Sequence, residues 1–257
     1  MILDRIVERK KEEVSYLKAH GISLPANFAD ENFDSPRGFK QALEQYDGVA
    51  IIAEVKKASP SKGVICQDFA PGDIAMNYQK NGAQAVSVLT DVDFFQGALA
   101  HLVQVRQTIS LPVLRKDFII DELQIEEASA HGADAILLIA AILSSTQISD
   151  YKQMARELGL DSLVEIHNEQ ELDRALRADA DLIGINNRNL NDFSVDINTT
   201  FRLKRLIPES IPVVSESGLT SADDLALLRA NDVCAALIGE SLMREGQHSN
   251  KLGRLRG

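Results

Sequence analysis

Eight short apolar runs, rich in β-branched residues, between residue 50 and residue 238 constrain the fold of this chain more than any other feature. Each run is too short for a typical helix, and each is followed by enough chain for a loop and a crossover helix. Consecutive units of this kind are typical of a parallel sheet covered by helices. We therefore predict strands at residues 50–55, 85–89, 112–114, 135–139, 163–166, 182–185, 211–214 and 235–238.

A quasi-repeat groups these runs in pairs. Every second run follows a related turn, and the second positions of these turns, residues 83, 133, 180 and 232, are separated by 50, 47 and 52 residues. A Gly or Asn in such a turn can end the preceding helix in a left-handed conformation. We expect the repeat to introduce the even-numbered strands of an eight-unit ring. The turns are Gly82-Ala-Gln-Ala, Gly132-Ala-Asp-Ala, Asp179-Ala-Asp-Leu and Asn231-Asp-Val-Cys.

Chain length and strand number decide between two α/β architectures. A (β/α)8 barrel typically needs about 250 residues, and this chain has 257. An open doubly wound sheet is the alternative, but no G-x-G-x-x-G motif follows the first predicted strand. We predict a (β/α)8 TIM barrel with an N-terminal helical extension. Residues 1–257 would form a single domain, in which residues 1–47 are the extension and residues 48–257 the barrel.

The extension differs in pattern from the rest of the chain. It begins with apolar residues at roughly helical spacing among many charges, namely Leu3, Val7, Val14 and Leu17. We expect a helix there, a loop over the polar stretch 21–37, and a second short helix around Phe39 and Leu43. The charge run at residues 8–13 is predicted to form a solvated helix face.

Composition excludes several classes of protein. The net charge of −11 argues against a binder of nucleic acid or anionic membranes, because its field would repel phosphate. Cys66 and Cys234 are the only cysteines and are far apart, which argues against a disulfide framework or a cysteine-rich zinc site. The five histidines show no metal-ligand spacing. We therefore expect no metal and, without a nucleotide-binding loop, no cofactor.

The hydropathy pattern indicates where in the cell the protein is located. The longest apolar run, residues 135–143, has 9 residues, whereas a membrane-spanning helix needs about 20. The first ten residues interrupt their apolar positions with charge and lack the apolar core of a secretory signal. We expect a cytoplasmic protein that contacts no membrane. The sequence leaves the oligomeric state open and is compatible with a monomer.

Charged side chains gather where the predicted strands end. In a barrel covered by helices, a charged residue within a strand must face the lumen or the mouth. The carboxyl ends of the strands carry the active sites of such barrels. Singly, these residues could form ordinary ion pairs, but their convergence favours an active site. They are Glu54 and Lys56 from the first strand, Lys116 from the third, Glu165 from the fifth, Asn186 and Arg188 from the sixth, and Glu216 from the seventh.

The loops after the last two predicted strands indicate a phosphate site. Gly218 and Gly239 each lie at a strand end, just before a predicted helix. Glycine permits close backbone approach, and the amides at a helix N-terminus stabilise a dianion. A glycine there also suits a tight turn, but such barrels frequently bind phosphate at these two loops. We therefore predict a phosphorylated small-molecule ligand.

The chain contains five motifs in order, Ile52-Ala-Glu-Val-Lys-Lys-Ala-Ser-Pro-Ser-Lys-Gly, Leu114-Arg-Lys-Asp-Phe-Ile-Ile-Asp, Leu163-Val-Glu-Ile-His, Ile185-Asn-Asn-Arg-Asn-Leu and Val214-Ser-Glu-Ser-Gly. With Ile2-Leu-Asp-Arg-Ile and Pro36-Arg-Gly-Phe-Lys-Gln-Ala-Leu, they closely resemble the indole-3-glycerol phosphate synthase family of tryptophan biosynthesis. The resemblance covers essentially the whole chain. It implies a (β/α)8 barrel and a carboxy-lyase without a cofactor. The substrate would be 1-(2-carboxyphenylamino)-1-deoxyribulose 5-phosphate, converted to indole-3-glycerol phosphate with loss of carbon dioxide and water.

The matching motifs also imply roles for individual residues. Lys116 would be the main general acid, Glu165 the general base, and Lys56 a second cation at the reacting carbonyl or carboxylate. Glu54, Asn186, Arg188 and Glu216 would orient the lysines and the substrate hydroxyls, with Ser217 also at the mouth.

The same resemblance implies residues that bind the substrate. Phe95 and Phe118 would sandwich the anthranilate ring, with core packing as the alternative. Some relatives carry Ser where this chain has Glu240, so only a backbone contact to phosphate is expected there. The phosphate would be held by Ser59, Gly218, Gly239 and the backbone of Glu240.

The sequence is also compatible with two other functions. A phosphosugar lyase or aldolase could use Lys116 or Lys56 as a Schiff-base nucleophile. A non-catalytic sensor of a phosphorylated metabolite could keep the phosphate loops without turnover, although the intact Lys56, Lys116 and Glu165 argue against it. The sequence does not decide which lysine donates the first proton.

Overall fold

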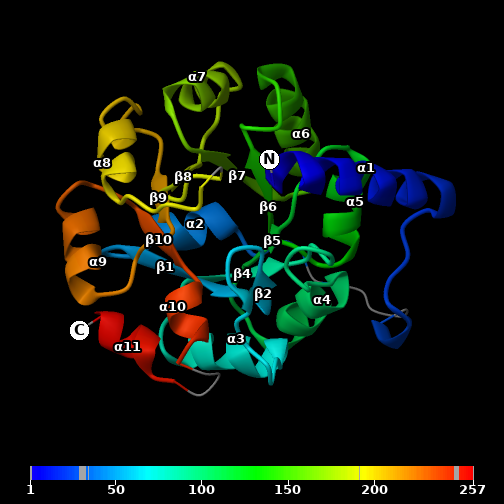
Figure 1. Ribbon diagram of the computed structural model, residues 1–257, viewed down its shortest axis with the longest axis horizontal. Helices are drawn as coiled ribbons and strands as arrows, with labels where there is room; N and C mark the ends of the chain where they lie inside the picture. The colour runs from blue at the N-terminus through cyan, green and yellow to red at the C-terminus, as the bar shows by residue number, and fades with distance from the viewer. Residues whose placement is uncertain (1, 29–32, 34, 191, 246–248, 257) are drawn as a thin grey trace.

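Eight parallel strands close into a barrel surrounded by helices (Figure 1). The computed structural model describes residues 2–28, 33, 35–190, 192–245 and 249–256. Hydrogen bonds join the strands in the order β1-β10-β9-β8-β7-β6-β5-β4, and β4 pairs with β1 to complete the ring. The predicted (β/α)8 barrel is therefore confirmed. The strands are β1 (Ala50–Val55), β4 (Ala85–Leu89), β5 (Val113–Lys116), β6 (Ala135–Ile139), β7 (Asp161–Ile166), β8 (Ile183–Asn186), β9 (Val213–Glu216) and β10 (Ala235–Ile238).

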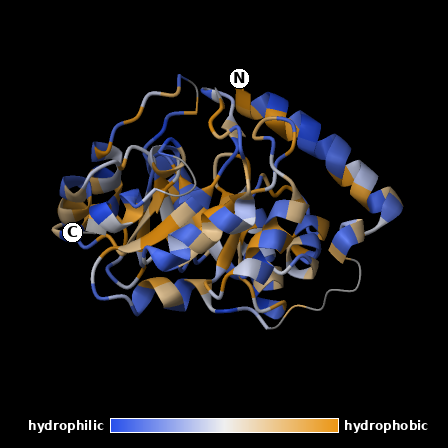
Figure 2. Cartoon of the chain, turned by 90° about the horizontal axis from the view of Figure 1, so that it is seen from below, coloured by the Kyte–Doolittle hydropathy of each residue, from blue (hydrophilic) through white to orange (hydrophobic). Residues whose placement is uncertain are grey.

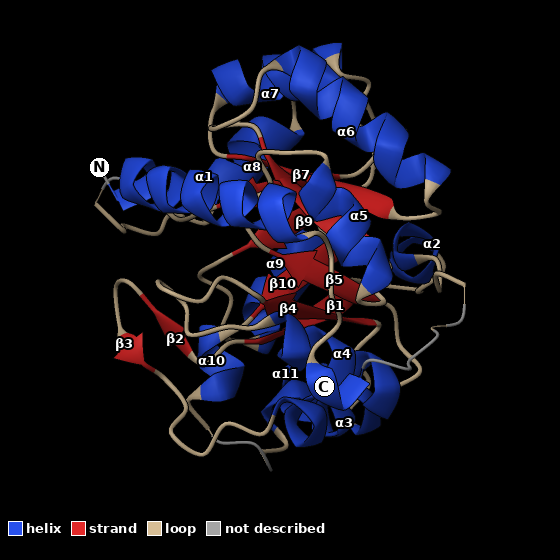
Figure 3. Cartoon of the chain, turned by 90° about the vertical axis from the view of Figure 1, so that its right-hand side faces the viewer, coloured by secondary structure: helices blue, strands red, loops and turns tan. Residues whose placement is uncertain are grey.

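The crossover helices cover the outside of the ring, with strands at the centre and helices around them in Figure 3. Within the described ranges, no helix combines the length and apolar character needed to cross a membrane. The helices after the strands are α3 (Pro71–Lys80), α4 (Leu99–Thr108), α5 (Leu123–Ala130), α6 (Ser145–Glu157), α7 (Glu169–Arg177), α8 (Asn198–Lys204), α9 (Ala222–Arg229), α10 (Glu240–Met243) and α11 (Lys251–Arg256).

The third and seventh strands of the barrel end later than predicted. Strand β5 continues to Lys116, and β9 continues to Glu216, each two residues beyond the apolar run that predicted it. An apolar run stops at the first polar residue, whereas these strands continue and turn Lys116 and Glu216 toward the lumen. Lys116 and Glu216 are therefore fixed by strand hydrogen bonds rather than carried on loops.

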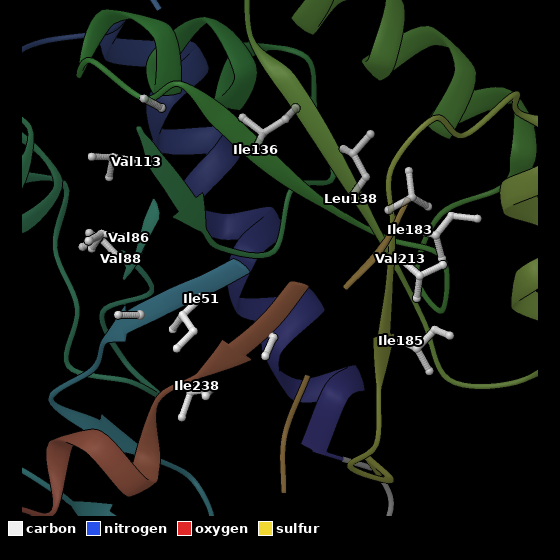
Figure 4. Packing of buried hydrophobic residues seen from close by; sticks show 14 of the residues in the cluster. Ile51, Val86, Val88, Val113, Ile136, Leu138, Ile183, Ile185, Val213 and Ile238 are labelled. Carbon is white, nitrogen blue, oxygen red and sulfur yellow. The ribbon is translucent and has the colours of Figure 1, made fainter. Parts of the chain in front are cut away.

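Alternate residues of each strand enter two separate apolar clusters. In β1, Ile51, Ala53 and Val55 pack in the cluster between barrel and helices, while Ala50 and Ile52 pack in the cluster inside the barrel. Figure 4 shows ten labelled side chains of the outer cluster spaced around the strands, and Figure 2 shows the apolar strands between helices with hydrophilic outer faces. The same alternation turns Glu54 into the lumen.

The left-handed turns of the quasi-repeat occur before the even-numbered strands of the barrel, as predicted. Gly82, Gly132 and Asp179 have φ values of 89°, 78° and 51°, and precede β4, β6 and β8. Before β10 the prediction was off by one residue, because Asp232 and not Asn231 has the positive φ, at 52°. The Asn231 side chain instead donates a hydrogen bond to the Leu227 carbonyl, at 2.9 Å, in the preceding helix.

The extension forms α1 (Ile2–His20), a 3-10 turn (Ala26–Phe28) and α2 (Phe39–Glu44), which confirms both predicted helices, while residues 29–32 and 34 of the predicted loop lie outside the described residues. Phe39 and Leu43 of α2 are fully buried in the cluster inside the barrel. We propose on this ground that residues 1–257 are one domain. A short hairpin after β1, formed by β2 (Ala58–Ser59) and β3 (Gly63–Val64), was not predicted, because strands of two residues leave no periodic pattern.

One residue of the charge run in α1 is buried, contrary to our prediction of a solvated face. Lys10 is 2% exposed, and its Nζ lies 2.8 Å from Asp117 Oδ1 and 3.2 Å from Asp91 Oδ2. It also contacts Glu13 Oε2 at 2.6 Å. The carboxylates of Asp91 and Asp117 follow β4 and β5, so this cluster fixes α1 to the carboxyl end of the barrel.

Candidate active site

A cavity of about 650 Å³ opens at the carboxyl ends of the strands, and all the predicted site residues line it. The barrel brings them together from loops and strand ends that are far apart in sequence. The set comprises Glu54, Lys56, Ser59, Phe95, Lys116, Phe118, Glu165, Asn186, Arg188, Glu216, Ser217, Gly218, Gly239 and Glu240. Among the described residues, no group of three or more His, Cys, Asp or Glu side chains could hold a metal ion.

Lys116 lies between two buried carboxylates. Its Nζ is 2.7 Å from Glu216 Oε2 and 3.4 Å from Glu165 Oε2. Strands β5, β7 and β9 supply these three groups, and Glu165 also accepts a hydrogen bond from Asn186 at the end of β8. A second ion pair joins Lys56 to Glu54 across the end of β1. Lys56, Lys116, Glu54, Glu165 and Glu216 thus form one cluster of two ammonium groups and three carboxylates within the cavity.

The protonation of this cluster follows from burial and from the excess of carboxylates. Burial alone would lower the pKa of Lys116, but Glu216, Glu165 and Glu54 outweigh it and hold that pKa well above its usual range. Burial alone would raise the pKa of Glu165, but Lys116 and then His167 outweigh it and lower the value. Lys116 is thus a protonated donor beside an ionised Glu165.

At Glu216 the influences that raise the carboxyl pKa outweigh the one that lowers it. Burial raises its pKa, the charge of Lys116 lowers it, and the negative charges of Glu165 and Glu54 raise it further, to about 7. Its Oε1 atom is buried and has no hydrogen-bond partner among the described residues. Since three carboxylates share two lysines, the cluster retains one proton near neutral pH.

We expect Glu216→Gln to change how stability depends on pH. The pKa of Glu216 is about 7 in the folded protein against an ordinary 4.5. Below 4.5 both states bind the proton. Between 4.5 and 7 the unfolded chain has lost it, so the free energy of unfolding falls as pH rises. Glutamine does not titrate, so the variant should gain on the order of 3 kcal/mol relative to wild type over this window.

Urea unfolding at pH 4.5 and pH 7.5 measures this gain. Glu209→Gln, a change at an exposed position after α8, is the matched control and should differ from wild type by the same amount at both pH values. If the difference between Glu216→Gln and wild type is also constant with pH, Glu216 does not retain a proton in the folded protein.

Two glycines make room for the carboxylates. A Cβ atom at position 184, in β8, would overlap Glu216 Oε1, and a Cβ atom at position 239, after β10, would overlap Glu54 Oε2. Neither glycine has a positive φ. Gly184 was not among the predicted site residues, because only the packing of β8 against β9 places it beside Glu216. Because a glycine has no Cβ atom, both positions leave room for the buried carboxylates.

The two predicted phosphate loops differ in structure. Gly239 leads directly into α10, as predicted. Gly218 does not lead directly into a helix, because α9 begins only at Ala222. The first-turn amides of α9 are capped by its own residues, with Asp224 N donating to Ser221 Oγ at 3.2 Å. The loop after β9 thus offers its own backbone rather than a helix N-terminus.

The loop after β9 has an unusual backbone conformation. Ser217 and Gly218 have φ values of 68° and 82°, and a non-glycine residue such as Ser217 rarely adopts this region. Ser217 Oγ donates a hydrogen bond to Asn186 Oδ1 at 2.9 Å, which fixes the turn beside β8. A Cβ atom at position 218 would lie 2.6 Å from Val195 Cγ1, so a side chain there is both strained and crowded.

Glu240 lies between two guanidinium groups at the rim of the cavity. Its Oε2 is 3.6 Å from Arg188 Nη2, and its Oε1 is 2.9 Å from Arg244 Nη2. Arg244 was missed by the sequence reasoning, although its spacing four residues after Glu240 on a short helix was a signal. Other lining residues that were not predicted include Ile2, Leu3, Ile6, Pro60, Ser61, Lys62, Leu190, Phe193, Val195, Thr220, Ser241, Glu245 and Lys251.

Phe95 and Phe118 form the aromatic part of the wall. Their ring centroids are 6.1 Å apart with an interplanar angle of 36°, and both side chains are half-buried. Phe118 also packs against the cluster inside the barrel, and both rings present part of their surface to the cavity. The apolar residues Ile2, Leu3 and Ile6 of α1 line the same cavity.

Comparison with known proteins identifies the family. A family model described as indole-3-glycerol phosphate synthase matches residues 3–255. The indole-3-glycerol phosphate synthase of Desulfotalea psychrophila is 61% identical over 254 residues, which cover 99% of this chain and 98% of the relative. The protein of the same name from Chlorobium phaeovibrioides is 52% identical over 241 residues, covering 93% of each chain.

Solved structures with low sequence identity share only the fold. The N-acetylmannosamine-6-phosphate 2-epimerase of Clostridium perfringens superposes with a TM-score of 0.60 at 14% identity, covering 76% of this chain and 88% of that one. KGPDC from Streptococcus mutans superposes with a TM-score of 0.62 at 11% identity, covering 82% and 96%. The full-length match to the family model and the close relatives carry the assignment instead: this chain belongs to the indole-3-glycerol phosphate synthase family.

Proposed function

We propose that this chain catalyses the reaction of its family, the conversion of 1-(2-carboxyphenylamino)-1-deoxyribulose 5-phosphate to indole-3-glycerol phosphate, carbon dioxide and water. The observation that carries the proposal is the placement of Lys116 between Glu216 and Glu165 in the cavity. A protonated amine beside an ionised carboxylate supplies an acid and a base to one bound molecule. The reaction needs both.

The first steps explain the need for an acid. Ring closure joins the aromatic carbon that carries the carboxylate to the ketone carbon, and negative charge develops on the ketone oxygen. In our proposal Lys116 gives this oxygen a proton, which makes it a hydroxyl, while Lys56 stabilises the neighbouring charge. The carboxylate then leaves as carbon dioxide, and the electron pair of the broken carbon–carbon bond restores the aromatic ring.

The last step explains the need for a base. The hydroxyl leaves as water after it takes up a proton from an acid. Glu165 removes a proton from the neighbouring carbon, and the electrons of that bond form the double bond of the indole ring. Glu54 would orient Lys56, while Asn186 and Glu216 would orient Glu165 and Lys116, in agreement with their contacts.

The charge of Lys116 argues against the Schiff-base alternative. A lysine nucleophile must be neutral, which enzymes achieve by an apolar site or a second cation. Lys116 instead has two carboxylates within 3.4 Å, and they raise its pKa well above the usual range. We therefore expect no covalent adduct on Lys116 when borohydride is added to the enzyme with a keto-substrate.

The rim of the cavity would bind the phosphate and the aromatic ring. Ser59, Ser217, Gly218, Gly239 and the backbone of Glu240 would contact the phosphate, and Arg188 would add a cationic contact. Phe95 and Phe118 would enclose the anthranilate ring. A cytoplasmic location stays a prediction, with which the two free thiols Cys66 and Cys234 agree.

We expect Glu240→Ser to bind phosphate more tightly than wild type. The Glu240 carboxylate pairs with Arg188 and Arg244 at the rim, so it competes with a phosphate dianion for these cations. A partly exposed ion pair is worth up to about 1 kcal/mol, which predicts an affinity gain of up to roughly fivefold. The inhibition constant of inorganic phosphate and the KM for substrate measure it. An unchanged or weaker inhibition would place the phosphate away from Glu240, and Glu209→Ser is the matched control.

Appearance of indole fluorescence after mixing the enzyme with the carboxyphenylamino-deoxyribulose phosphate tests the proposed function. Turnover should need no partner protein. If the substrate binds without product formation, the chain is a sensor of a phosphorylated metabolite rather than an enzyme.

A further inference from the structure

His167 lies beside the proposed general base and has no role in the mechanism above. It follows β7 two residues after Glu165, and its side chain is only 10% exposed. Its Nδ1 is 2.9 Å from Glu171 Oε2, and its Nε2 is 3.5 Å from Glu165 Oε1. The imidazole therefore bridges two carboxylates, one inside the cavity and one in the first turn of α7.

Glu171 is held firmly behind the imidazole. Its Oε2 also accepts a hydrogen bond from the backbone amide of His167 at 2.8 Å, and its Oε1 accepts one from Asn168 Nδ2 at 2.7 Å. The side chain of Asn168 in turn caps α7 by accepting from the Glu171 amide at 3.0 Å. This reciprocal cap fixes the Glu171 carboxylate, and through it the ring of His167, relative to β7.

The groups that face His167 are all acidic. Burial lowers the pKa of His167, but Glu171, Glu165 and Glu216 outweigh it and raise the value. Nε2 is buried and forms no hydrogen bond within the described residues, so Glu165 is the group it faces. On its other sides Glu165 faces Lys116, Asn186, Glu216 and Glu54, and Lys116 is its strongest cationic neighbour.

We propose that His167, held by Glu171, is a positioning residue that keeps the Glu165 carboxylate ionised and turned toward the cavity. The proposal rests on the proposed function, in which Glu165 is the base. A carboxylate this deeply buried would bind a proton at neutral pH without cations beside it. Lys116 supplies one cation but also donates a proton during the reaction. His167 supplies a second one that does not leave Glu165 when Lys116 loses its proton.

The pH dependence of kcat/KM tests this role. In His167→Gln the side chain keeps a polar amide but carries no charge. An opposite charge at this distance shifts a carboxyl pKa by about 1–3 units, so the acidic limb should move to higher pH by at least about one unit. Activity should recover at higher pH. Glu171→Gln should move the limb in the same direction but less, because it leaves the imidazole in place.

His20→Gln is the matched control, because His20 is exposed at the end of α1, and it should leave the profile unchanged. A purely structural role of His167 would lower activity equally at every pH. If the acidic limb stays in place in both His167→Gln and Glu171→Gln while the wild type turns over substrate, the inference about His167 is wrong and the proposed function stands. No turnover by the wild type would instead overturn the proposed function.

A second measurement is independent of turnover. The NMR titration of the His167 ring in the wild-type enzyme, assigned by comparison with His167→Gln, should give a midpoint above the ordinary value of 6.5. The midpoint should fall in Glu165→Gln, since coupling between two charges is reciprocal. An unchanged midpoint in Glu165→Gln would show that the two groups do not interact and would overturn the inference.

Discussion

Substitution of Lys116 by methionine is expected to lower kcat by at least about 10²–10⁴-fold, the contribution typical of a general acid, with little change in substrate affinity. Methionine keeps most of the side-chain length but has no proton to give. The proposed contacts to phosphate and ring come from other loops, so the substrate should still bind. The developing negative charge on the ketone oxygen would lose its partner, and ring closure should be the step that stops.

Single-turnover analysis of Lys116→Met should therefore show bound but unreacted substrate. Lys116 is the strongest cationic influence on Glu165, so its loss also raises the pKa of that carboxyl. Rates should be compared above neutral pH, where Glu165 regains its charge. Lys11→Met, a change at an exposed lysine of α1, is the control and should have wild-type kcat. Turnover of Lys116→Met near the wild-type rate would make Lys56 the leading candidate for the acid.

The composition of the candidate site could be predicted because burial restricts where charge can lie in a barrel. The outer faces of the strands pack mainly against apolar helix residues, as Ile51 and Val55 do in β1. A charged residue such as Glu54 then turns inward, whereas Arg115 of β5 lies on the outer face only because Asp117 and Glu127 pair with it. Two-residue periodicity and the apolar runs were therefore sufficient to place seven charged or polar groups around one cavity.

Other features depend on contacts between distant segments and could not be read from local pattern. Lys10 appears in a run of charges typical of a solvated helix, yet it is buried against Asp91 and Asp117. Gly184 looks like any small strand residue until β9 places Glu216 beside it. His167 differs in that its two carboxylates, Glu165 and Glu171, are close in sequence, but the contacts of the ring with both depend on the backbone turn from β7 into α7.

The protonation states of the site residues depend on which charged groups lie close to one another. The sequence shows which ionisable groups end the strands, but pKa values depend on the distances among them. Glu165 and Glu216 are both buried glutamates in contact with Lys116. Burial nevertheless raises the pKa of Glu216, whereas the neighbouring cations lower the pKa of Glu165. The difference follows from His167 and Asn186, which contact Glu165. Such assignments of acid and base need the three-dimensional arrangement.

Glu165→Gln is expected to stop the reaction at a later point than Lys116→Met. Glutamine preserves the shape of the side chain but removes the base, so ring closure and loss of carbon dioxide should continue with Lys116 as acid. Removal of the carbon-bound proton should then slow by about 10²–10⁴-fold. A decarboxylated intermediate that still holds its hydroxyl should accumulate. Quenched single-turnover samples analysed by mass would show it as substrate minus carbon dioxide, without the loss of water.

The two variants together decide whether acid and base are separate. Lys116 Nζ and Glu165 Oε2 are 3.4 Å apart, so each substitution also affects the protonation of the other group. If that mutual effect were their whole contribution, both variants would stall at the same species. Different stalled species, unreacted substrate in Lys116→Met and the decarboxylated intermediate in Glu165→Gln, require that the two groups act on different bonds. A common stalled species would reduce Glu165 to a charge partner of Lys116, and the base would have to be sought among the carboxylates nearest to it in the cavity, Glu54 and Glu216.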